Sequence, residues 1–427
     1  MPGPPENQPP ENQPPENQPP GNQPPVPPAP GRRFPLGAAV TVAQLEDDPH
    51  PVLGMLRERE PVSWLPVLAG WLVTRHDLAG QVLRDAASFT VDDPRFSTAR
   101  VVGPSMLSLD GAEHDRHRGP FSHGFSRGEV RARLAGYVEA EAGRLVTRMR
   151  PAGAADLRTG LAGPLSVAVV AEALGLGQAE PSLVLSWYSA IVGAVSELAS
   201  DADAGVSAAG SAAFGMLSTR LRAVIAADDR PTLLGEAASG GAAAGGGALD
   251  PAEVVSNAAV LMFGGIETTE GMITNVLLHL LSHPDQLSLV LGDPGLVPGA
   301  VEESLRLEPA AAVVDRYATR DIRLGGADIR RGDLVTVSIA GAGRDPAVFA
   351  DPGRFDVRRQ NARRHLAFAR GPHFCIGAHL AGLEARAAVR AALTLPGLRL
   401  DPEQPSAPRG LVFRKPPSLR VRWEPVA

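Results

Sequence analysis

The sequence predicts a mainly α-helical protein with small β-sheets. An apolar run opens at Leu261 and ends at His283-Pro284, a length typical of a buried helix. A second helical pattern begins at Ala378, and aromatic residues make up only 4% of the chain, with alanine and leucine filling the expected helices. The run from Trp71 to Asp77 is typical of a strand that enters a helix, so we expect sheet beside the helices.

Residues 1–33 differ in character from the rest of the chain. The pentapeptide Glu-Asn-Gln-Pro-Pro occurs three times in succession from residue 6, and Gly-Asn-Gln-Pro-Pro follows at 21–25. Because such a sequence has almost nothing to bury, we expect a disordered Pro/Gln/Asn-rich repeat tail, a solubilising extension rather than a partner-binding segment. The folded domain is expected to span 34–427.

Composition and charge exclude several classes of function. The formal net charge is −6, so the chain has no electrostatic footprint for nucleic acid. The N-terminal segment lacks the cationic and apolar regions of a signal peptide, and we find no apolar stretch of about 18 residues for a membrane span. We therefore expect a cytoplasmic protein. The Gly/Ala/Ser-rich stretch 236–248 is expected to form a flexible loop.

Cys375 is the only cysteine of the chain. It cannot close an internal disulfide or complete a site of several thiolates, so any chemistry it performs must use a single thiolate. A lone cysteine is more often a small buried apolar residue. The helix expected from Ala378 favours the functional alternative, because it places Cys375 just before a helix N-terminus, where the dipole stabilises negative charge.

The residues around this cysteine form a loop with the sequence Phe368-Ala369-Arg370-Gly371-Pro372-His373-Phe374-Cys375-Ile376-Gly377. Gly371 and Gly377 permit a tight backbone whose N–H groups could approach the sulfur and tune it as a ligand. Phe368 can shield the sulfur, and His373 supplies a polar group two residues before it. The loop is therefore a candidate ligand-binding site built on one thiolate.

A charged pair lies on the helix that Pro309 is expected to end. Glu303 and Arg306 are three residues apart, so they share one helix face and are close enough for a charge-assisted pair. Taken alone, this pattern is common on solvated helices.

The long apolar helix carries two adjacent glycines, followed by an acid and an alcohol. Each glycine costs roughly 1 kcal/mol relative to alanine, so Gly264 and Gly265 indicate that something flat approaches the backbone. Glu267 and Thr268 are the matching polar feature. The alternative is a buried helix kinked at its glycines, with Thr268 bonded back to a carbonyl one turn earlier.

Together these motifs closely resemble those of the cytochromes P450, in that family's order. The cysteine loop is similar to the family's haem-ligand loop, which implies that Cys375 is the axial thiolate of a haem b iron. Pro352-Gly353-Arg354-Phe355 resembles the segment that supplies a second arginine to the family's Glu-x-x-Arg motif, which implies a triad of Glu303, Arg306 and Arg354. The implied fold is one helix-rich domain, with haem between the long oxygen-activating helix and the helix after the cysteine loop.

The resemblance implies further roles for residues that match the family's motifs. His114 and Arg118, from a His-x-x-x-Arg match on an early helix, would bind the haem propionates together with Arg316 and His373. The helix glycines would make room for oxygen, and the acid–alcohol pair Glu267 and Thr268 would manage proton delivery. The full set of implied cofactor-binding residues is His114, Arg118, Gly264, Gly265, Arg316, Phe368, Gly371, His373, Cys375 and Gly377, with Cys375 as the metal ligand.

The resemblance implies a haem-thiolate monooxygenase. It would use dioxygen and two electrons from NAD(P)H, delivered through a ferredoxin reductase and ferredoxin, to hydroxylate or epoxidise a lipophilic small molecule in secondary metabolism. Arg363, Arg364 and Arg370 crowd the approach to the cysteine loop and suit an acidic ferredoxin. Substrate contacts are expected in four mostly apolar segments, namely 89–109, Met262-Phe263, Val313-Val314 and Val412-Phe413.

Other functions are compatible with the same motifs. The iron could drive oxidative ring closure or aryl coupling without oxygen insertion. A peroxide-using enzyme is disfavoured because the acid–alcohol pair is intact, and a non-catalytic auxiliary protein is disfavoured because the thiolate loop is intact. Two residues depart from the family pattern: Gly343 stands where asparagine is usual, and Ala369 stands where glycine usually follows the phenylalanine.

Overall fold

The computed structural model describes residues 33–177, 181–200, 205–227, 233–238 and 249–425. The helices are α2 Pro35–Ala38, α3 Val42–Glu46, α4 His50–Arg59, α5 His76–Arg84, α6 Ser97–Val102, α7 Gly111–Ser122, α8 Arg127–Met149, α9 Gly163–Ala173, α10 Pro181–Ser200, α11 Ala208–Ala227, α12 Leu233–Ala238, α13 Pro251–Ser282, α14 Pro284–Gly292, α15 Val297–Leu307, α16 Ile339–Gly343 and α17 Ala378–Ala392. Shorter helical turns are η1 Pro66–Leu68, η2 Arg150–Ala152, η3 Arg158–Ala162, η4 Pro294–Leu296, η5 Ala362–Arg364 and η6 Gly371–His373. The predicted mainly α-helical class is confirmed.

Two segments with sequence-based predictions lie mostly outside the described residues. Almost all of the predicted repeat tail lies outside the described residues, as does most of the stretch 236–248. Residues 236–238 belong to α12, so the prediction of a loop was wrong for that part. In the described part of the chain, none of the helices combines the length and the apolar composition required to cross a membrane.

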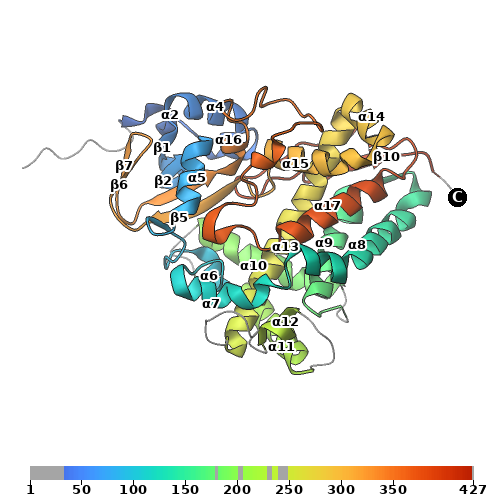
Figure 1. The fold of residues 1–427 in the computed structure, drawn as a ribbon, viewed down its shortest axis with the longest axis horizontal. Helices are drawn as coiled ribbons and strands as arrows, with labels where there is room; N and C mark the ends of the chain where they lie inside the picture. The colour runs from blue at the N-terminus through green and yellow to red at the C-terminus, as the bar shows by residue number, and fades with distance from the viewer. Residues whose placement is uncertain (1–32, 178–180, 201–204, 228–232, 239–248, 426–427) are drawn as a thin grey trace, which may run out of the picture.

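The strands form two sheets on one side of the molecule, beside α2, α4 and α5, and a third small sheet on the opposite side (Figure 1). They are β1 Val62–Leu65, β2 Gly70–Val73, β3 Phe89–Thr90, β4 Ala154–Asp156, β5 Val313–Ala318, β6 Ile322–Leu324, β7 Ala327–Ile329, β8 Leu334–Ser338, β9 Arg399–Leu400 and β10 Arg420–Arg422. The largest sheet has the order β1-β2-β8-β5-β3, and only its β2–β8 pair is parallel. Since β2 leads into α5, the predicted strand that enters a helix is confirmed.

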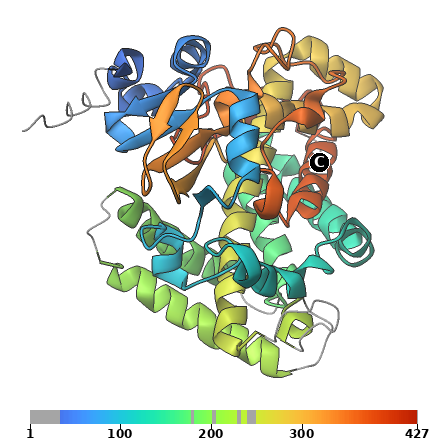
Figure 2. The same ribbon diagram turned by 60° about the vertical axis from the view of Figure 1, so that its left-hand side comes forward.

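Helix α13 runs through the core of the helical part (Figure 2). It begins with a capping box, in which the Asp250 side chain accepts from two backbone N–H groups and Glu253 bonds back to the Asp250 N–H. Pro284 starts the next helix. From 254 to 281 every residue is buried except five, which are 261, 264, 265, 267 and 268. These five lie at helical spacing, so the buried helix has one open stripe.

Helix α17 packs against α8, α13 and α15, which places the residues just before it beside the core. Figure 1 shows α17 crossing α13. The cysteine loop is therefore held by the same helices that form the apolar core.

Candidate active site

The loop that carries Cys375 has a backbone that demands glycine at one position. Gly371 has a φ of +72°, and a Cβ there would lie 2.6 Å from the carbonyl oxygen of Leu83 in α5. The Cys375 N–H donates to the Phe368 carbonyl at 2.9 Å and closes the loop before α17. The close approach to α5 thus explains Gly371 without reference to any ligand.

Burial and nearby positive groups have opposite effects on the thiol of Cys375. Burial raises the pKa of the Cys375 thiol, whereas the backbone N–H groups of Gly377 and Ala378 and the charge on Arg118 act to lower it. The cysteine side chain is nevertheless solvent-accessible. Both observations hold for a sulfur that lies deep in the protein and is open on one side, and a metal ion bound there would displace the thiol proton.

Four predicted cofactor-binding side chains converge beside this loop. The rings of His114 and His373 lie 4.6 Å apart between centroids. Arg118 donates from Nη2 to the carbonyl of Phe374 at 2.7 Å. Arg316 is only 5% exposed, and the charge that most favours its ionised form is that of Asp110, the acid beside His373.

The hydrogen bonds of these side chains leave capacity for an anion. Nε2 of His114 is buried and has no hydrogen-bond partner in the part of the chain that the structure describes. Within the described residues, no carboxylate forms an ion pair with Arg118 or Arg316, whose bonds go to backbone carbonyls. Burial lowers the pKa of His114, Arg118 and Arg316. This is expected where buried basic groups lose water and find too few negative partners to replace it. Two such guanidinium groups and one imidazole fit the two carboxylates of haem b.

Asp110 binds the predicted site residue His373, and the sequence motifs did not indicate it. Its Oδ1 lies 2.8 Å from Nε2 of His373, and its Oδ2 accepts from the Thr90 hydroxyl at 2.6 Å and from the Val91 N–H at 2.9 Å. Burial acts to raise the pKa of Asp110, but these bonds outweigh it and lower the pKa to about 2. Asp110 also precedes α7, where an acid is ordinary, so its position alone carried no distinguishing signal.

The glycines of α13 face different surroundings. A Cβ at Gly264 would meet nothing within 4 Å, so this glycine opens onto the stripe. A Cβ at Gly265 would lie 2.7 Å from Cγ2 of Val170, so helix packing against α9 explains that glycine. The assignment of Gly265 to cofactor binding stays a prediction. Thr268 donates to the Gly264 carbonyl at 2.5 Å, the back-bond that the sequence left open as an alternative.

Glu267 is held by residues from two other segments. Its Oε1 lies 2.6 Å from Nζ of Lys415, and its Oε2 accepts from the hydroxyl of Tyr188 in α10. Lys415 also binds Oε2 of Glu270 at 2.6 Å, and Glu270 in turn binds Nε of Arg158 at 2.7 Å. The sequence contained one signal for this network, which is that Lys415 is the only lysine.

The predicted triad contains the wrong second arginine. Glu303 and Arg306 do pair, with Nε 2.7 Å from Oε2, and both side chains are fully buried. Glu303 binds Arg359 rather than Arg354, at 2.9 Å from Nε to Oε1. Arg354 is exposed and contributes only its backbone carbonyl, which accepts from Arg306 at 3.0 Å.

The basic surface near the cysteine loop is larger than predicted. Arg370 lies near Arg364, to whose carbonyl it donates at 3.1 Å, and Arg84 adds a further positive charge. Arg363 has a side chain that is 79% exposed. A second group of arginines surrounds Arg386 of α17. Burial lowers the pKa of Arg386, and the nearby positive charges of Arg390 and Arg127 lower it further.

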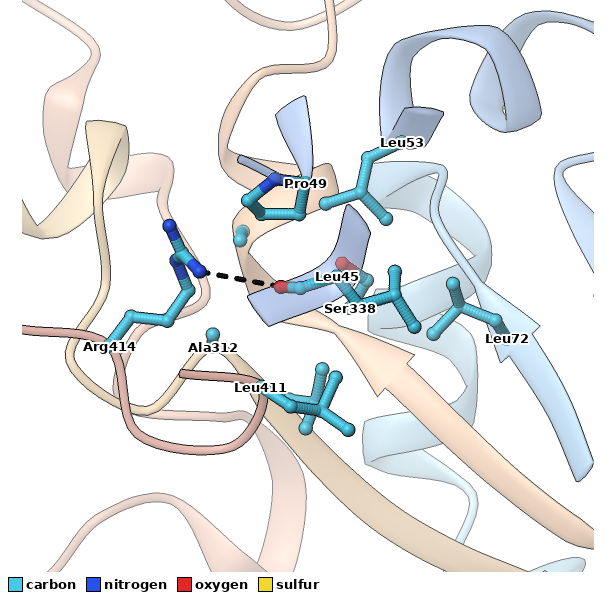
Figure 3. A pocket seen from close by; sticks show the side chains of 10 residues that line it. Leu45, Pro49, Leu53, Leu72, Ala312, Ser338, Leu411 and Arg414 are labelled. Carbon is cyan, nitrogen blue, oxygen red and sulfur yellow. Dashed lines mark hydrogen bonds between the residues drawn. The ribbon is translucent and has the colours of Figure 1, made fainter. Parts of the chain in front are cut away.

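Two of the expected substrate segments meet on α13. The rings of Phe263 and Phe413 pack edge to face at 5.8 Å. Val313 instead lines a separate pocket between α3, α4 and the sheet, where Arg414 donates to the Leu45 carbonyl (Figure 3). That pocket has a volume of about 10 Å³, roughly the space of one water molecule, so it is no substrate chamber.

Comparisons with known proteins agree with this arrangement. The family described as Cytochrome P450 matches residues 295–417. The cytochrome P450 monooxygenase PikC of Streptomyces venezuelae is 35% identical over 88% of this chain and 91% of its own length. The mycinamicin IV hydroxylase/epoxidase of Micromonospora griseorubida is 34% identical over 87% of this chain and 94% of its own. The crystal structure of HmtN, a post-tailoring hydroxylase involved in himastatin biosynthesis, superposes with a TM-score of 0.77 and 30% identity, covering 90% of this chain and 100% of the other.

The chain therefore belongs to the cytochrome P450 family. It is a P450 monooxygenase, and haem is the cofactor of that family. The predicted fold and enzyme class are confirmed.

Proposed function

We propose that this P450 binds haem b through Cys375 and hydroxylates or epoxidises a lipophilic small molecule in secondary metabolism. The observation that carries the proposal is the single open sulfur at the start of α17, where the backbone N–H groups of Gly377 and Ala378 act to lower the pKa of its thiol. The names of two relatives support the reaction class, since one is a hydroxylase/epoxidase and the other a hydroxylase in a biosynthetic route.

The residues of the chain would bind and orient the cofactor. Cys375 would ligate the iron, with Phe368 packed nearby, and the two N–H donors would moderate the donor strength of the sulfur. His114, Arg118 and Arg316 would hold the propionates. Haem bound in this way would supply the iron at which dioxygen is reduced.

The open stripe of α13 would provide the oxygen-binding and proton-delivery side. Gly264 leaves space next to the helix, and Thr268 keeps hydroxyl lone pairs that its back-bond does not use. Glu267 would bring protons from its polar network. The apolar pair Phe263 and Phe413 would contact a lipophilic substrate.

Electrons would come from NAD(P)H through a ferredoxin reductase and an acidic ferredoxin, all in the cytoplasm. The arginines around the cysteine loop support such docking because a local basic patch on an acidic protein steers an acidic partner. Charge reversal at Arg364 and Arg370 should slow reduction by spinach ferredoxin at low salt and leave reduction by dithionite unchanged. Equal ferredoxin rates would place docking elsewhere.

The carbon monoxide difference spectrum tests the ligand assignment. The reduced, haem-loaded protein should show the far red-shifted Soret band of thiolate ligation, and Cys375→Ser should abolish it. Survival of the band in this variant would overturn the proposal. Haem content of the purified protein separates an enzyme from an auxiliary protein. Incorporation of ¹⁸O from labelled dioxygen separates oxygen insertion from ring closure or coupling.

A further inference from the structure

Lys415 is the one lysine among 41 basic residues, and it bridges two carboxylates of α13. Its Nζ lies 2.6 Å from Oε1 of Glu267 and 2.6 Å from Oε2 of Glu270, and its side chain is 12% exposed. An ammonium is a compact charge with three rotatable donors, whereas guanidinium is a planar fork that suits one carboxylate. A lysine is therefore well suited to a position between two acids that are three residues apart.

The position of Lys415 is fixed by its own segment. A Cβ at Gly271 would lie 3.5 Å from Cβ of Lys415, so the lysine stem runs directly over α13. Lys415 and Arg409 exchange backbone hydrogen bonds at 3.1 and 3.3 Å. The preceding Arg414 is buried and paired with Glu308 at 2.8 Å. These anchors leave the ammonium little freedom to move away from α13.

The charged and titratable groups of the described residues that bind Glu267 belong to one network. The hydroxyl of Tyr188 in α10 donates to Oε2 of Glu267. Burial and the Glu267 charge raise the pKa of Tyr188, so the phenol stays protonated and can donate. Arg158 binds Glu270 from η3. With Glu267, Glu270, Lys415 and Arg158, the network contains two acids and two bases. Both oxygens of Glu267 are thus occupied, and neither is bonded to Thr268, whose hydroxyl donates to Gly264.

We infer that Lys415 is a positioning residue that holds the Glu267 carboxylate turned towards α10, and thereby sets the pH range of proton delivery by Glu267. The inference rests on the proposed function, in which Glu267 delivers protons. To pass a proton towards Thr268, Glu267 must exchange one of its present partners. Without the ammonium, two neighbouring carboxylates share one cation less, and the neutral form of each becomes more favourable.

The contact itself is testable without turnover. In protein labelled with ¹⁵N-lysine, the single side-chain ammonium should give a protected cross-peak in the diamagnetic ferrous carbon monoxide form, because buried ion-paired protons exchange slowly. Glu267→Gln and Glu270→Gln should each shift or weaken this peak, and Arg363→Gln, an exposed control, should not. An ammonium peak that is absent or insensitive to both variants would refute the bridge.

The role is testable from the reduction of dioxygen to hydrogen peroxide, which consumes two electrons and two protons and needs no substrate. Peroxide formation would be followed against pH with NADPH, spinach ferredoxin and its reductase. In Lys415→Met the midpoint of the profile should move upward by about one pH unit or more, because the carboxyl keeps its proton to higher pH. Lys415→Arg retains the positive charge but suits one carboxylate, so its midpoint should lie closer to that of the unmodified protein than the midpoint of Lys415→Met does.

The same change in a Glu267→Gln background separates positioning from a structural effect. Lys415→Met should cause no further displacement there if it acts through Glu267. An equal displacement in both backgrounds, or no displacement in either, would overturn the inference. Failure of the proposed function is recognised independently, because the carbon monoxide band of thiolate ligation would then be absent from the unmodified protein.

Discussion

Arg359 and Glu303 form an ion pair in the interior, with Nε of the arginine 2.9 Å from Oε1 of the acid. The same carboxylate holds Arg306 through both of its oxygens, at 2.7 and 2.8 Å. Arg306 in turn donates to the carbonyls of Gly343 and Pro352 at 2.8 Å each. One buried acid therefore ties α15 to the chain segment that leads into the cysteine loop.

The first prediction compares two arginines of that segment. Arg359→Ala should lower the free energy of unfolding of the haem-loaded protein by about 1.5–3 kcal/mol, because Glu303 loses one charge-assisted hydrogen bond in the interior while Arg306 still neutralises its charge. Arg354→Ala should change it by less than about 0.5 kcal/mol, because that side chain is exposed and only its carbonyl is used. Urea titration measures both. A larger loss in Arg354→Ala would restore the triad expected from the motif.

This pair shows what sequence could and could not predict. The motif placed an arginine near Glu303 correctly, but Arg354 and Arg359 share one segment, and tertiary contacts decide which side chain turns inward. The cysteine loop, α13 and α17 were predictable because their signals are local. Tyr188 and Lys415 were not assigned to the site, since both lie far along the chain from Glu267 and only the fold brings them there.

The second prediction concerns backbone strain next to the cysteine loop. Ala369 has a φ of +56°, at the position where the family usually has glycine. Because a side chain costs about 1–2 kcal/mol in this region, and glycine loses more entropy on folding, Ala369→Gly should stabilise the protein by about 0.5–1 kcal/mol. The midpoint of thermal unfolding should rise accordingly.

Gly371→Ala is the matched control for that substitution. Its φ is +72°, and the added methyl would also meet the Leu83 carbonyl, so this variant should be destabilised. If Ala369→Gly destabilises the protein, the packing of the partly buried methyl group contributes more to the free energy of unfolding than the backbone strain costs.

The third prediction is a loss of stability in mild acid caused by His279. Burial lowers the pKa of His279 to about 3, from an ordinary value of 6.5. Between these values the unfolded chain binds more protons than the folded one, so stability is complete above pH 6.5 and falls as pH decreases towards 3. The slope due to this group is at most about 1.4 kcal/mol per pH unit.

His279→Gln can keep a hydrogen bond to Ser304, which lies 2.9 Å from Nδ1, and should remove the loss that begins near pH 6.5. Glu308 is the internal reference. Burial acts to raise its pKa, but bonding from His50 and the charges around it lower the pKa to about 2, so its contribution is lost only below its ordinary value of 4.5. Urea titrations at a series of pH values distinguish the two windows, and an unchanged slope between pH 6 and 5 in the variant would contradict the assignment.

The fourth prediction separates a proton-delivery role of Thr268 from its role as a back-bonding residue. Thr268 and Thr274 make the same bond on α13, to the carbonyls of Gly264 and Glu270 at 2.5 and 2.6 Å, but only Thr268 lies on the open stripe. Thr268→Ala should still bind haem and substrate, while product formed per NAD(P)H consumed falls by about tenfold or more and hydrogen peroxide rises. Thr274→Ala loses an equivalent bond inside the core, so it should change stability and leave the product yield intact.

The measurement is the ratio of product and peroxide to NAD(P)H for a substrate found by spectral titration. Equal yields in the two variants would show that Thr268 takes no part in proton delivery. Thr269 could not take over this role in the present structure, because its side chain is buried and α13 would have to rotate to expose it.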